Sequence, residues 1–279
     1  MSSTSWYLMC RPTYFDICYV INPWMEGNLH ALNCNETFRQ WQQLYDVVTN
    51  HCEVELLESQ PGLPDMTFTA NAGAIHKNQA VVSRFLCKER AGEEDHFEAW
   101  FNAKGFKVYK TPPGIPFEGA GDCVSDQSEE WLWTGYGFRS SLNAHRYLSE
   151  WFDAEVISLR LVDNRFYHLD TCFCSLTGGY LVYYPPAFDR PSLDQIERRV
   201  PKAKRIPVSE HDAVCLACNI INIGDEIILN RASADLEARL RKAGFRVTQV
   251  DVSEFIRSGG ATRCLTLSVS NDNGSTVDP

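Results

Sequence analysis

The sequence predicts an α/β fold in which a ββαβ module is repeated around a common centre. Two observations lead to this prediction. A helical segment that runs directly into a short apolar strand occurs five times along the 279 residues, and further strand-like segments separate these units. The strand-to-helix joints carry no glycine-rich dinucleotide-binding or phosphate-binding fingerprint, which disfavours a doubly wound sheet, the main alternative.

The first unit begins after residues 6–21, whose apolar and aromatic side chains are typical of a strand that Pro23 ends. Asn35 is expected to cap a helix that runs into a strand at residues 54–57. The apolar residues that keep helical spacing on this helix are Phe38, Trp41, Leu44 and Val48.

The next two units repeat this order of helix and strand. A helix at residues 93–103 stops at Gly105, a residue type favoured just beyond a helix end, and a strand follows at 106–109. Residues 141–152 predict a third helix, which leads into a strand at 156–159.

The last two units complete the set of five. Residues 192–195 read as a capping box, and the helix that they begin leads to a strand at 205–208. A fifth helix at residues 233–243 ends at Gly244 and is followed by a strand at 245–250.

The composition excludes several classes of protein. The net charge of −10, with no basic stripe to offset the acids, argues against a nucleic-acid partner. No apolar run approaches the roughly 20 residues that span a bilayer, and the N-terminus lacks the features of a signal peptide. Eleven cysteines, an odd number spread over a long chain, indicate a reducing compartment. We therefore expect a cytoplasmic protein without membrane contact.

Cys215 and Cys218 form a C-x-x-C pair, which raises zinc or redox chemistry. A structural zinc site would need two more ligands, and no second pair accompanies this one. Apolar neighbours surround both residues, so buried helical thiols are the favoured interpretation.

Polar side chains interrupt the apolar sequence in four stretches. They are Asp65 and Asn71 beside Phe68 in residues 64–73, Glu118 and Asp122 in 117–122, Arg139 in 135–141, and His168 and Asp170 in 166–170. Each stretch also has a structural interpretation, as a turn held by polar side chains, a plain loop or a satisfied core histidine. Arginine at 139 is suited to binding a carboxylate.

Cys264 stands after Gly259 and Gly260 and before an apolar run that predicts a buried strand. A thiol placed there is a nucleophile if a neighbouring group lowers its pKa or accepts its proton. The alternative is a structural cysteine, because this residue type is commonly buried.

Taken together, these residues offer a thiol nucleophile, a histidine for proton transfer and acids that can hold a cation. They indicate a covalent hydrolase or transferase that acts on a positively charged carbon electrophile. A guanidinium group fits, because paired carboxylates match its planar donors. A protonated histidine beside the thiol would also lower the thiol pKa.

The motifs resemble those of the guanidino-group-modifying superfamily (amidinotransferases or penteins), which includes arginine deiminases, dimethylarginine dimethylaminohydrolases and succinylarginine dihydrolases. The resemblance extends from about residue 22 to residue 267. It rests on four ordered motifs: Phe68-Thr69-Ala70-Asn71, Phe117-Glu118-Gly119, His168-Leu169-Asp170, and Gly259-Gly260 ahead of Cys264. It implies a five-bladed α/β propeller (pentein fold) of ββαβ modules around a central active site.

The resemblance also implies roles for site residues. Cys264 would attack the guanidino carbon, His168 would transfer protons, and Glu118 would orient and charge His168. The substrate-binding set that it implies is Asp170 on the guanidinium nitrogens, Arg90 and Arg139 on the α-carboxylate, and Phe68 on the aliphatic stem, with Asp65 and Asn22 beside them. Neither a metal nor an organic cofactor is implied.

One departure from the family separates the candidate reactions. Arginine deiminases and dimethylarginine hydrolases carry an acid where this chain has Asn71. The motif Thr69-Ala70-Asn71-Ala72 resembles more closely that of succinylarginine dihydrolases and of the cyanobacterial arginine dihydrolases. The latter precede an ornithine-cyclodeaminase-like region in a longer chain. The resemblance therefore implies hydrolysis of L-arginine to L-ornithine, carbon dioxide and two ammonia, with Asn71 as a further catalytic residue.

Three alternatives stay open: a deiminase that stops at citrulline, a dimethylarginine dimethylaminohydrolase, and an arginine-sensing module without catalysis. We expect residues 1–269 to form the catalytic domain. Residues 270–279 are polar and read as a tail or linker, as if cut from a longer chain with an ornithine-cyclodeaminase-like domain. A homo-oligomer is left open as the assembly.

Overall fold

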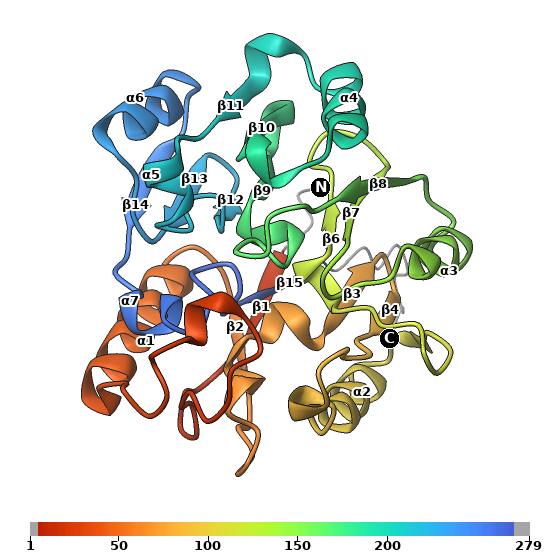
Figure 1. Ribbon diagram of the computed structural model, residues 1–279, viewed down its shortest axis with the longest axis vertical. Helices are drawn as coiled ribbons and strands as arrows, with labels where there is room; N and C mark the ends of the chain where they lie inside the picture. The colour runs from red at the N-terminus through yellow and green to blue at the C-terminus, as the bar shows by residue number, and fades with distance from the viewer. Residues whose placement is uncertain (1–4, 271–279) are drawn as a thin grey trace, which may run out of the picture.

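A computed structural model describes residues 5–270 of the chain, whose strands form five three-stranded sheets arranged in a ring (Figure 1). In every sheet the middle strand pairs antiparallel with one neighbour and parallel with the other. A helix connects the middle strand to its parallel partner, as a crossover between parallel strands requires. The predicted five-bladed α/β propeller of ββαβ modules is therefore confirmed.

The strands of the five sheets are β15 (Leu267–Ser270), β1 (Ser5–Cys10) and β2 (Val54–Leu57); β3 (Gly73–His76), β4 (Gln79–Val82) and β5 (Lys107–Lys110); β6 (Cys123–Ser125), β7 (Leu132–Tyr136) and β8 (Val156–Arg160); β9 (Phe173–Leu176), β10 (Tyr180–Tyr183) and β11 (Arg205–Pro207); and β12 (Ile221–Ile223), β13 (Glu226–Leu229) and β14 (Arg246–Gln249). The helices are α1 (Cys34–Thr49), α2 (Glu93–Ala103), α3 (Leu142–Phe152), α4 (Arg190–Arg199), α5 (Glu210–Ala213), α6 (Ala234–Lys242) and α7 (Ser253–Ile256). Figure 1 places β3, β6, β9, β12 and β15 around the centre and the long helices at the periphery.

Strands from the two ends of the described chain close the ring. β15 pairs antiparallel with β1, with Leu8 opposite Leu267. Both of these leucines are buried. The first sheet therefore forms only when the C-terminal strand returns to the N-terminal one, and this closure places Cys264 three residues before a central strand.

The inner strands are entered through short turns that carry polar side chains. The 3-10 turns η3 (Thr69–Ala72), η5 (Gly119–Gly121) and η6 (Leu169–Thr171) lead directly toward β3, β6 and β9. Turn η5 contacts both η3 and η6, so the three turns meet near the axis of the ring. Turns that are about fifty positions apart in the sequence are thereby brought together.

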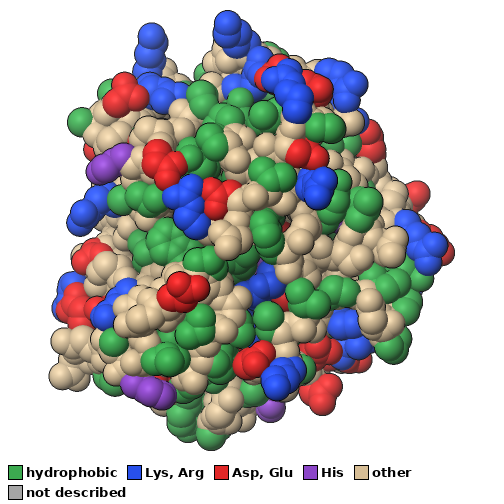
Figure 2. Space-filling model, in the orientation of Figure 1, with side chains coloured by type: hydrophobic (Ala, Val, Ile, Leu, Met, Phe, Trp, Pro, Cys, Tyr) green, Lys and Arg blue, Asp and Glu red, His purple; other side chains and the backbone are tan. Residues whose placement is uncertain are grey.

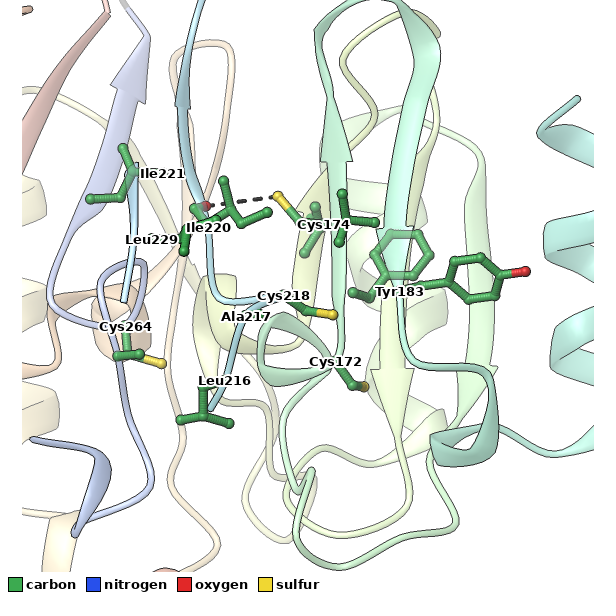
Figure 3. Close-up of a cluster of buried hydrophobic side chains, with 14 of the residues drawn as sticks. Cys172, Cys174, Tyr183, Leu216, Ala217, Cys218, Ile220, Ile221, Leu229 and Cys264 are labelled. Carbon is green, nitrogen blue, oxygen red and sulfur yellow. Dashed lines mark hydrogen bonds between the residues drawn. The ribbon is translucent and has the colours of Figure 1, made fainter. Parts of the chain in front are cut away.

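Cysteines contribute to the core as small apolar side chains. Figure 3 shows Cys172, Cys174 and Cys218 packed among Leu216, Ile221 and Leu229, with the thiol of Cys174 donating to the carbonyl of Ile220. Burial raises the pKa of the Cys172 and Cys218 thiols, as expected for inert core cysteines. All eleven cysteines are free, so the fold is held by packing rather than by cross-links.

Most of the predicted helices are confirmed, and one of them only with a shifted cap. Helix α2 matches residues 93–103, with Gly105 at φ +78°, and α3 begins after the cap Ser141. The cap of α1 is Asn33 rather than Asn35, because the Asn33 side chain accepts from the Glu36 N–H. Helix α1 therefore begins earlier than predicted.

Three further expectations on local structure are wrong. The strand predicted at 6–21 ends at Cys10, because the chain leaves the sheet there and forms the loop that covers the central pocket. The predicted capping box at 192–195 lies inside α4, whose cap is Asp189 with Ser192 as donor. Phe38 was expected in the core, but it is 43% exposed.

The Cys215–Cys218 pair also differs from its predicted setting. It lies in a turn that follows α5 rather than inside a helix. Leu216 has φ +52° there, a left-handed conformation that is unusual for a residue with a branched side chain. Cys218 is buried, whereas Cys215 is partly exposed.

Charged side chains of both signs are mixed on the surface (Figure 2). On the face in Figure 2, Lys and Arg side chains are interspersed with Asp and Glu instead of forming a stripe. Among residues 5–270, no helix is long and apolar enough to cross a membrane. The polar tail predicted at 270–279 lies outside the described residues, except for Ser270 at the end of β15.

Candidate active site

A narrow pocket at the centre of the ring gathers most of the predicted site residues. The predicted residues that line it are Asn22, Asp65, Phe68, Asn71, Arg90, Arg139, His168 and Cys264. The remaining two, Glu118 and Asp170, are fully buried and lie behind His168 and Cys264, which they contact. Residues from four separate motifs are therefore brought into one site.

The thiol of Cys264 lies between a carboxylate and an amide. Its Sγ atom is 3.5 Å from Oδ2 of Asp170, and Nδ2 of Asn219 donates to it at 3.1 Å. Burial and the nearby Asp170 carboxylate raise the pKa of the Cys264 thiol well above its usual range. Both effects favour the neutral thiol over the thiolate.

His168 and Arg139 both line the pocket and are joined through the carboxylate of Glu118. Its Nε2 atom is 2.7 Å from Oε2 of Glu118, and Nη1 of Arg139 donates to that same oxygen at 3.1 Å. Burial alone would raise the pKa of Glu118, but Arg139 and His168 lower it to about 2. Glu118 is consequently an anion that fixes the orientation of the His168 imidazole.

Asn71 is held in place by two neighbours. Its Oδ1 atom accepts from Nη1 of Arg90 at 2.8 Å, and its Nδ2 atom donates to the carbonyl of Glu118 at 3.3 Å. A Cβ atom at Gly121 would lie 2.5 Å from Nδ2, so this glycine leaves the space that the amide occupies. The orientation of the amide is thus fixed before any ligand arrives.

The two arginines differ in how many donors the protein already uses. Arg90 makes four hydrogen bonds: two to Glu93, one to Asn71 and one to the carbonyl of Asp65. Arg139 makes two, to Glu118 and to the carbonyl of Ile21. Since a guanidinium carries five N–H donors, Arg139 retains more capacity for an anionic ligand than Arg90 does.

Asp65 presents an unsatisfied carboxylate oxygen to this region. Its Oδ2 atom accepts from the hydroxyl of Tyr19 at 2.8 Å, whereas its buried Oδ1 atom has no hydrogen-bond partner among the described residues. Burial raises the pKa of Asp65, although Arg90 opposes this shift. A cationic group that entered the pocket would satisfy the free oxygen and favour the ionised acid.

Phe68 and the loop before Cys264 pack too closely for larger residues. A Cβ atom at Gly260 would lie 2.4 Å from the Phe68 ring, and Gly259 has φ +88°. The Phe68 ring also packs edge-on against Phe15 and Phe255. The two glycines therefore allow the loop to bring the thiol beside an apolar wall.

Asn22 has the turn role that its Asn-Pro sequence allows, and it also joins two parts of the site. Its Oδ1 atom caps the 3-10 turn η1 (Pro23–Met25), and its Nδ2 atom donates to the carbonyl of Ser258 at 3.0 Å. The N-terminal loop is thereby attached to the loop that leads to Cys264. A role of Asn22 in binding substrate stays a prediction.

Two other clusters lie outside this pocket. A larger cavity contains Arg263, Asp126 and Glu129, but none of the predicted site residues. Among residues 5–270, the group with metal-ligand geometry is Asp16, Cys18 and His30, on the N-terminal loop, where Cys18 and His30 are exposed. The chemistry indicated by the sequence is therefore confined to the central pocket.

Comparison with known proteins is consistent with this geometry. The family described as N,N dimethylarginine dimethylhydrolase, eukaryotic, matches residues 25–271. The chain belongs to this family. The N(G),N(G)-dimethylarginine dimethylaminohydrolase of Mycobacterium tuberculosis is 37% identical over 94% of this chain and 85% of its own length.

Proteins from cyanobacteria are more similar in sequence to this chain. The bifunctional arginine dihydrolase/ornithine cyclodeaminase ArgZ of Synechocystis sp. is 53% identical over 94% of this chain. The chain spans 37% of the length of ArgZ. The crystal structure of the N-terminal domain of ArgZ, a C264S mutant bound to substrate, has a TM-score of 0.95 and 52% identity, covering 96% of this chain and 98% of that one. A second structure of that domain, with N71S, is covalently bound to a reaction intermediate.

Four residues that shape the site were not predicted from the sequence: Tyr19, Glu93, Tyr167 and Asn219. Glu93 lies in a helix first turn, where acids are common for helix stability alone. Asn219 had a usable signal, because it lies two residues before its inner strand, as Asn71 does in another blade. The five-fold repeat, applied to side chains, would have found it.

Replacing Glu118 with Gln tests whether Glu118 is a buried anion held between Arg139 and His168. The pKa of Glu118 in the folded protein, about 2, lies below its usual value of 4.5. Its contribution to stability is therefore complete above about pH 4.5 and is lost as the pH falls toward 2. We expect the difference in unfolding free energy between the parent protein and Glu118→Gln to shrink by about 2 kcal/mol from pH 6 to pH 3, in denaturant titrations.

The control for this experiment is Asp235→Asn, at a side chain that is 81% exposed. The stability difference between this variant and the parent is expected to stay within about 0.5 kcal/mol over the same pH range. If the difference for Glu118→Gln is as flat as that of the control, Glu118 is not the buried anion described above.

Proposed function

We propose that this chain is the catalytic domain of an arginine dihydrolase. It would convert L-arginine and two waters into L-ornithine, carbon dioxide and two ammonia, through intermediates covalently bound to Cys264. The observation that carries the proposal is an amide rather than an acid at Asn71, in the same pocket as the Cys264 thiol. The similarity to ArgZ supports the same assignment.

The first half-reaction needs a thiolate, and the substrate itself would help to form it. A guanidinium cation beside Cys264 and Asp170 would offset the burial and the negative charge that raise the thiol pKa. The thiolate then attacks the guanidino carbon, the C–N bond to one terminal nitrogen breaks, and protonated His168 donates a proton to the departing ammonia. Water attacks the S-amidino intermediate, the C–S bond breaks, and citrulline and the thiol result.

The second half-reaction acts on a neutral ureido group. The Asn71 amide can donate to the ureido oxygen and so hold citrulline in a pose that Cys264 can attack again. A second ammonia leaves, and water cleaves the S-carbamoyl bond. The resulting carbamate of ornithine loses carbon dioxide, which completes the balance of two waters consumed and two ammonia released.

The remaining pocket residues suit the amino-acid end of the substrate. We assign the α-carboxylate chiefly to Arg139, because it makes only two hydrogen bonds within the protein, and we give Arg90 a smaller part in this contact. The free oxygen of Asp65 offers a partner for a substrate cation, and Phe68 an apolar wall for the aliphatic stem. Asn22 would hold the covering loop.

A second candidate is a dimethylarginine hydrolase, which the similarity to the enzyme of Mycobacterium tuberculosis favours. A deiminase that stops at citrulline is the third. Both reactions release their product after one hydrolysis, so they differ from a dihydrolase in the number of nitrogen atoms set free. The intact Cys264, His168 and Glu118 favour an enzyme over an arginine-sensing module.

We further propose that residues 1–269 act in a longer cytoplasmic protein, ahead of an ornithine-cyclodeaminase-like region. The printed description of ArgZ as bifunctional, and the 37% of its length that this chain spans, support this placement. Such a region would consume the ornithine made at Cys264. Assembly as a homo-oligomer stays a prediction.

Product counting tests the function directly. Incubation of the protein with L-arginine should release two ammonia for each arginine consumed, with ornithine as the final amino acid, measured by an ammonia assay and amino-acid chromatography. Agmatine lacks the α-carboxylate that Arg139 is proposed to bind, so its kcat/KM should be at least about tenfold lower. One ammonia and citrulline would indicate a deiminase. Dimethylamine from dimethylarginine, without turnover of arginine, would indicate the second candidate.

The variant Asn71→Asp tests the role of the amide. Aspartate can still accept from Arg90, but it cannot donate to the ureido oxygen and would face the carbonyl of Glu118 at about the same distance, 3.3 Å. An unsatisfied buried polar group costs about 1–3 kcal/mol, so we expect ornithine formation to fall roughly five- to hundredfold, with citrulline accumulating. Asn143→Asp, at an exposed position of α3, is the matched control and should match the parent. Ornithine formation by Asn71→Asp at the parental rate would refute this role.

A further inference from the structure

The five blades do not contribute to the site in the way that the sequence motifs suggest. Four inner strands are preceded by a proposed catalytic residue: Asn71 before β3, Glu118 before β6, His168 before β9, and Cys264 before β15. The fifth inner strand, β12, is preceded by Asn219, two residues before its start. This residue belongs to none of the four family motifs, yet it lies two residues before its inner strand, as Asn71 does in another blade.

We propose that Asn219 is a positioning residue that fixes Cys264 for attack and stabilises its thiolate through an N–H···S hydrogen bond. This inference rests on the proposed function, because it concerns the same nucleophile. It adds a residue from the one blade to which no role has been assigned.

The contacts of the Asn219 side chain define its orientation. Its Oδ1 atom accepts from the backbone N–H of Cys264 at 3.0 Å, and its Nδ2 atom donates to the carbonyl of Asp170 at 3.0 Å. A backbone N–H can only donate and a carbonyl can only accept, so these two groups determine which end of the amide is nitrogen. The second hydrogen on Nδ2 is then available to Sγ of Cys264, 3.1 Å away.

Burial makes these bonds hard to replace. Asn219 is fully buried, so water cannot take over a lost donor or acceptor. The backbone of Asn219 adds a second connection, because its carbonyl accepts from the hydroxyl of Thr262 at 2.5 Å. Both the loop before the nucleophile and the nucleophile itself are therefore held by one residue.

The local backbone is shaped to deliver this side chain. Leu216 has φ +52°, and its carbonyl accepts from the backbone N–H of Asn219 at 2.9 Å. Figure 3 shows the sulfur of Cys264 turned toward the segment that runs from Leu216 to Ile220. A left-handed conformation at a leucine is unfavourable and persists only where the surroundings enforce it, which is common at functional sites.

Asn219 opposes the electrostatic effect of Asp170. The Asp170 carboxylate, 3.5 Å from Sγ, disfavours a thiolate, whereas an N–H donor favours it. The other ionisable groups that face the pocket are Asp65, Arg90, Arg139, Tyr167 and His168, and Arg263 interacts with Asp170 from behind. Asn219→Ser removes the donor and leaves this set of charges unchanged, so a change in thiol ionisation in that variant would report on the hydrogen bond.

The test compares Asn219→Asp and Asn219→Ser with the parent. Asp keeps the acceptor for the Cys264 N–H but removes both donors, and Ser removes all of these contacts without adding charge. Alkylation of Cys264 by iodoacetamide, resolved by peptide mass spectrometry, should shift its pH dependence upward by about one unit or more in both variants. The kcat for arginine should fall at least about tenfold, while arginine binding in a Cys264→Ser background should stay within about twofold.

The matched control is Asn222→Asp on β12. This side chain makes hydrogen bonds to the carbonyls of Gly224 and Glu226 and does not line the central pocket. Its loss should leave the alkylation profile of Cys264 unchanged. Alkylation needs no substrate, so it tests Asn219 even if arginine is not turned over. A parental alkylation profile in both Asn219 variants would overturn the proposal, as would a parental kcat.

Discussion

The pocket depends on mutual compensation of charges that are almost fully removed from water. Glu93 and Glu118 are fully buried, and Arg90 and Arg139 are 3% and 4% exposed. Removing either partner of such a pair leaves an uncompensated buried charge, which typically costs about 3–5 kcal/mol. Arg90 and Glu93 are three residues apart in the sequence, and Arg139 pairs with Glu118 across 21 residues. Cys264 lies three residues before β15, which pairs with β1, so the complete site exists only once the ring has closed. Folding and construction of the site are therefore one event.

The five blades share one fold, but each contributes a different side chain to the site. Each blade presents a polar residue or a thiol in the segment that enters its inner strand, two to five residues before the strand begins. The blades differ in the chemistry that they deliver: an amide at Asn71, an acid at Glu118, a base at His168, a second amide at Asn219 and a thiol at Cys264. The five inner strands begin around the same centre, and the sequence before each strand determines which functional group lies there.

Much of this fold could be predicted because its local signals agree with its tertiary structure. Gly105 and Gly244 both end helices with positive φ, as their positions in the sequence suggest. The predictions that were wrong or missing concern segments whose structure depends on tertiary contacts. Residues 11–21 were predicted to continue the first strand, but they leave the sheet after Cys10. Phe38 keeps helical spacing but is 43% exposed. Asn219 escaped notice because its role depends on contacts with residues 45 and 49 positions away.

The ring delivers one thiol, Cys264, into the pocket that we propose binds a guanidinium cation. Mass spectrometry of acid-quenched reactions with L-arginine tests it most directly. We predict adducts on the peptide that contains Cys264 alone, with the mass of arginine less ammonia and of citrulline less ammonia, and their absence from Cys264→Ser. An adduct on any of the other ten cysteines, or turnover of arginine by Cys264→Ser at the parental rate, would contradict the account.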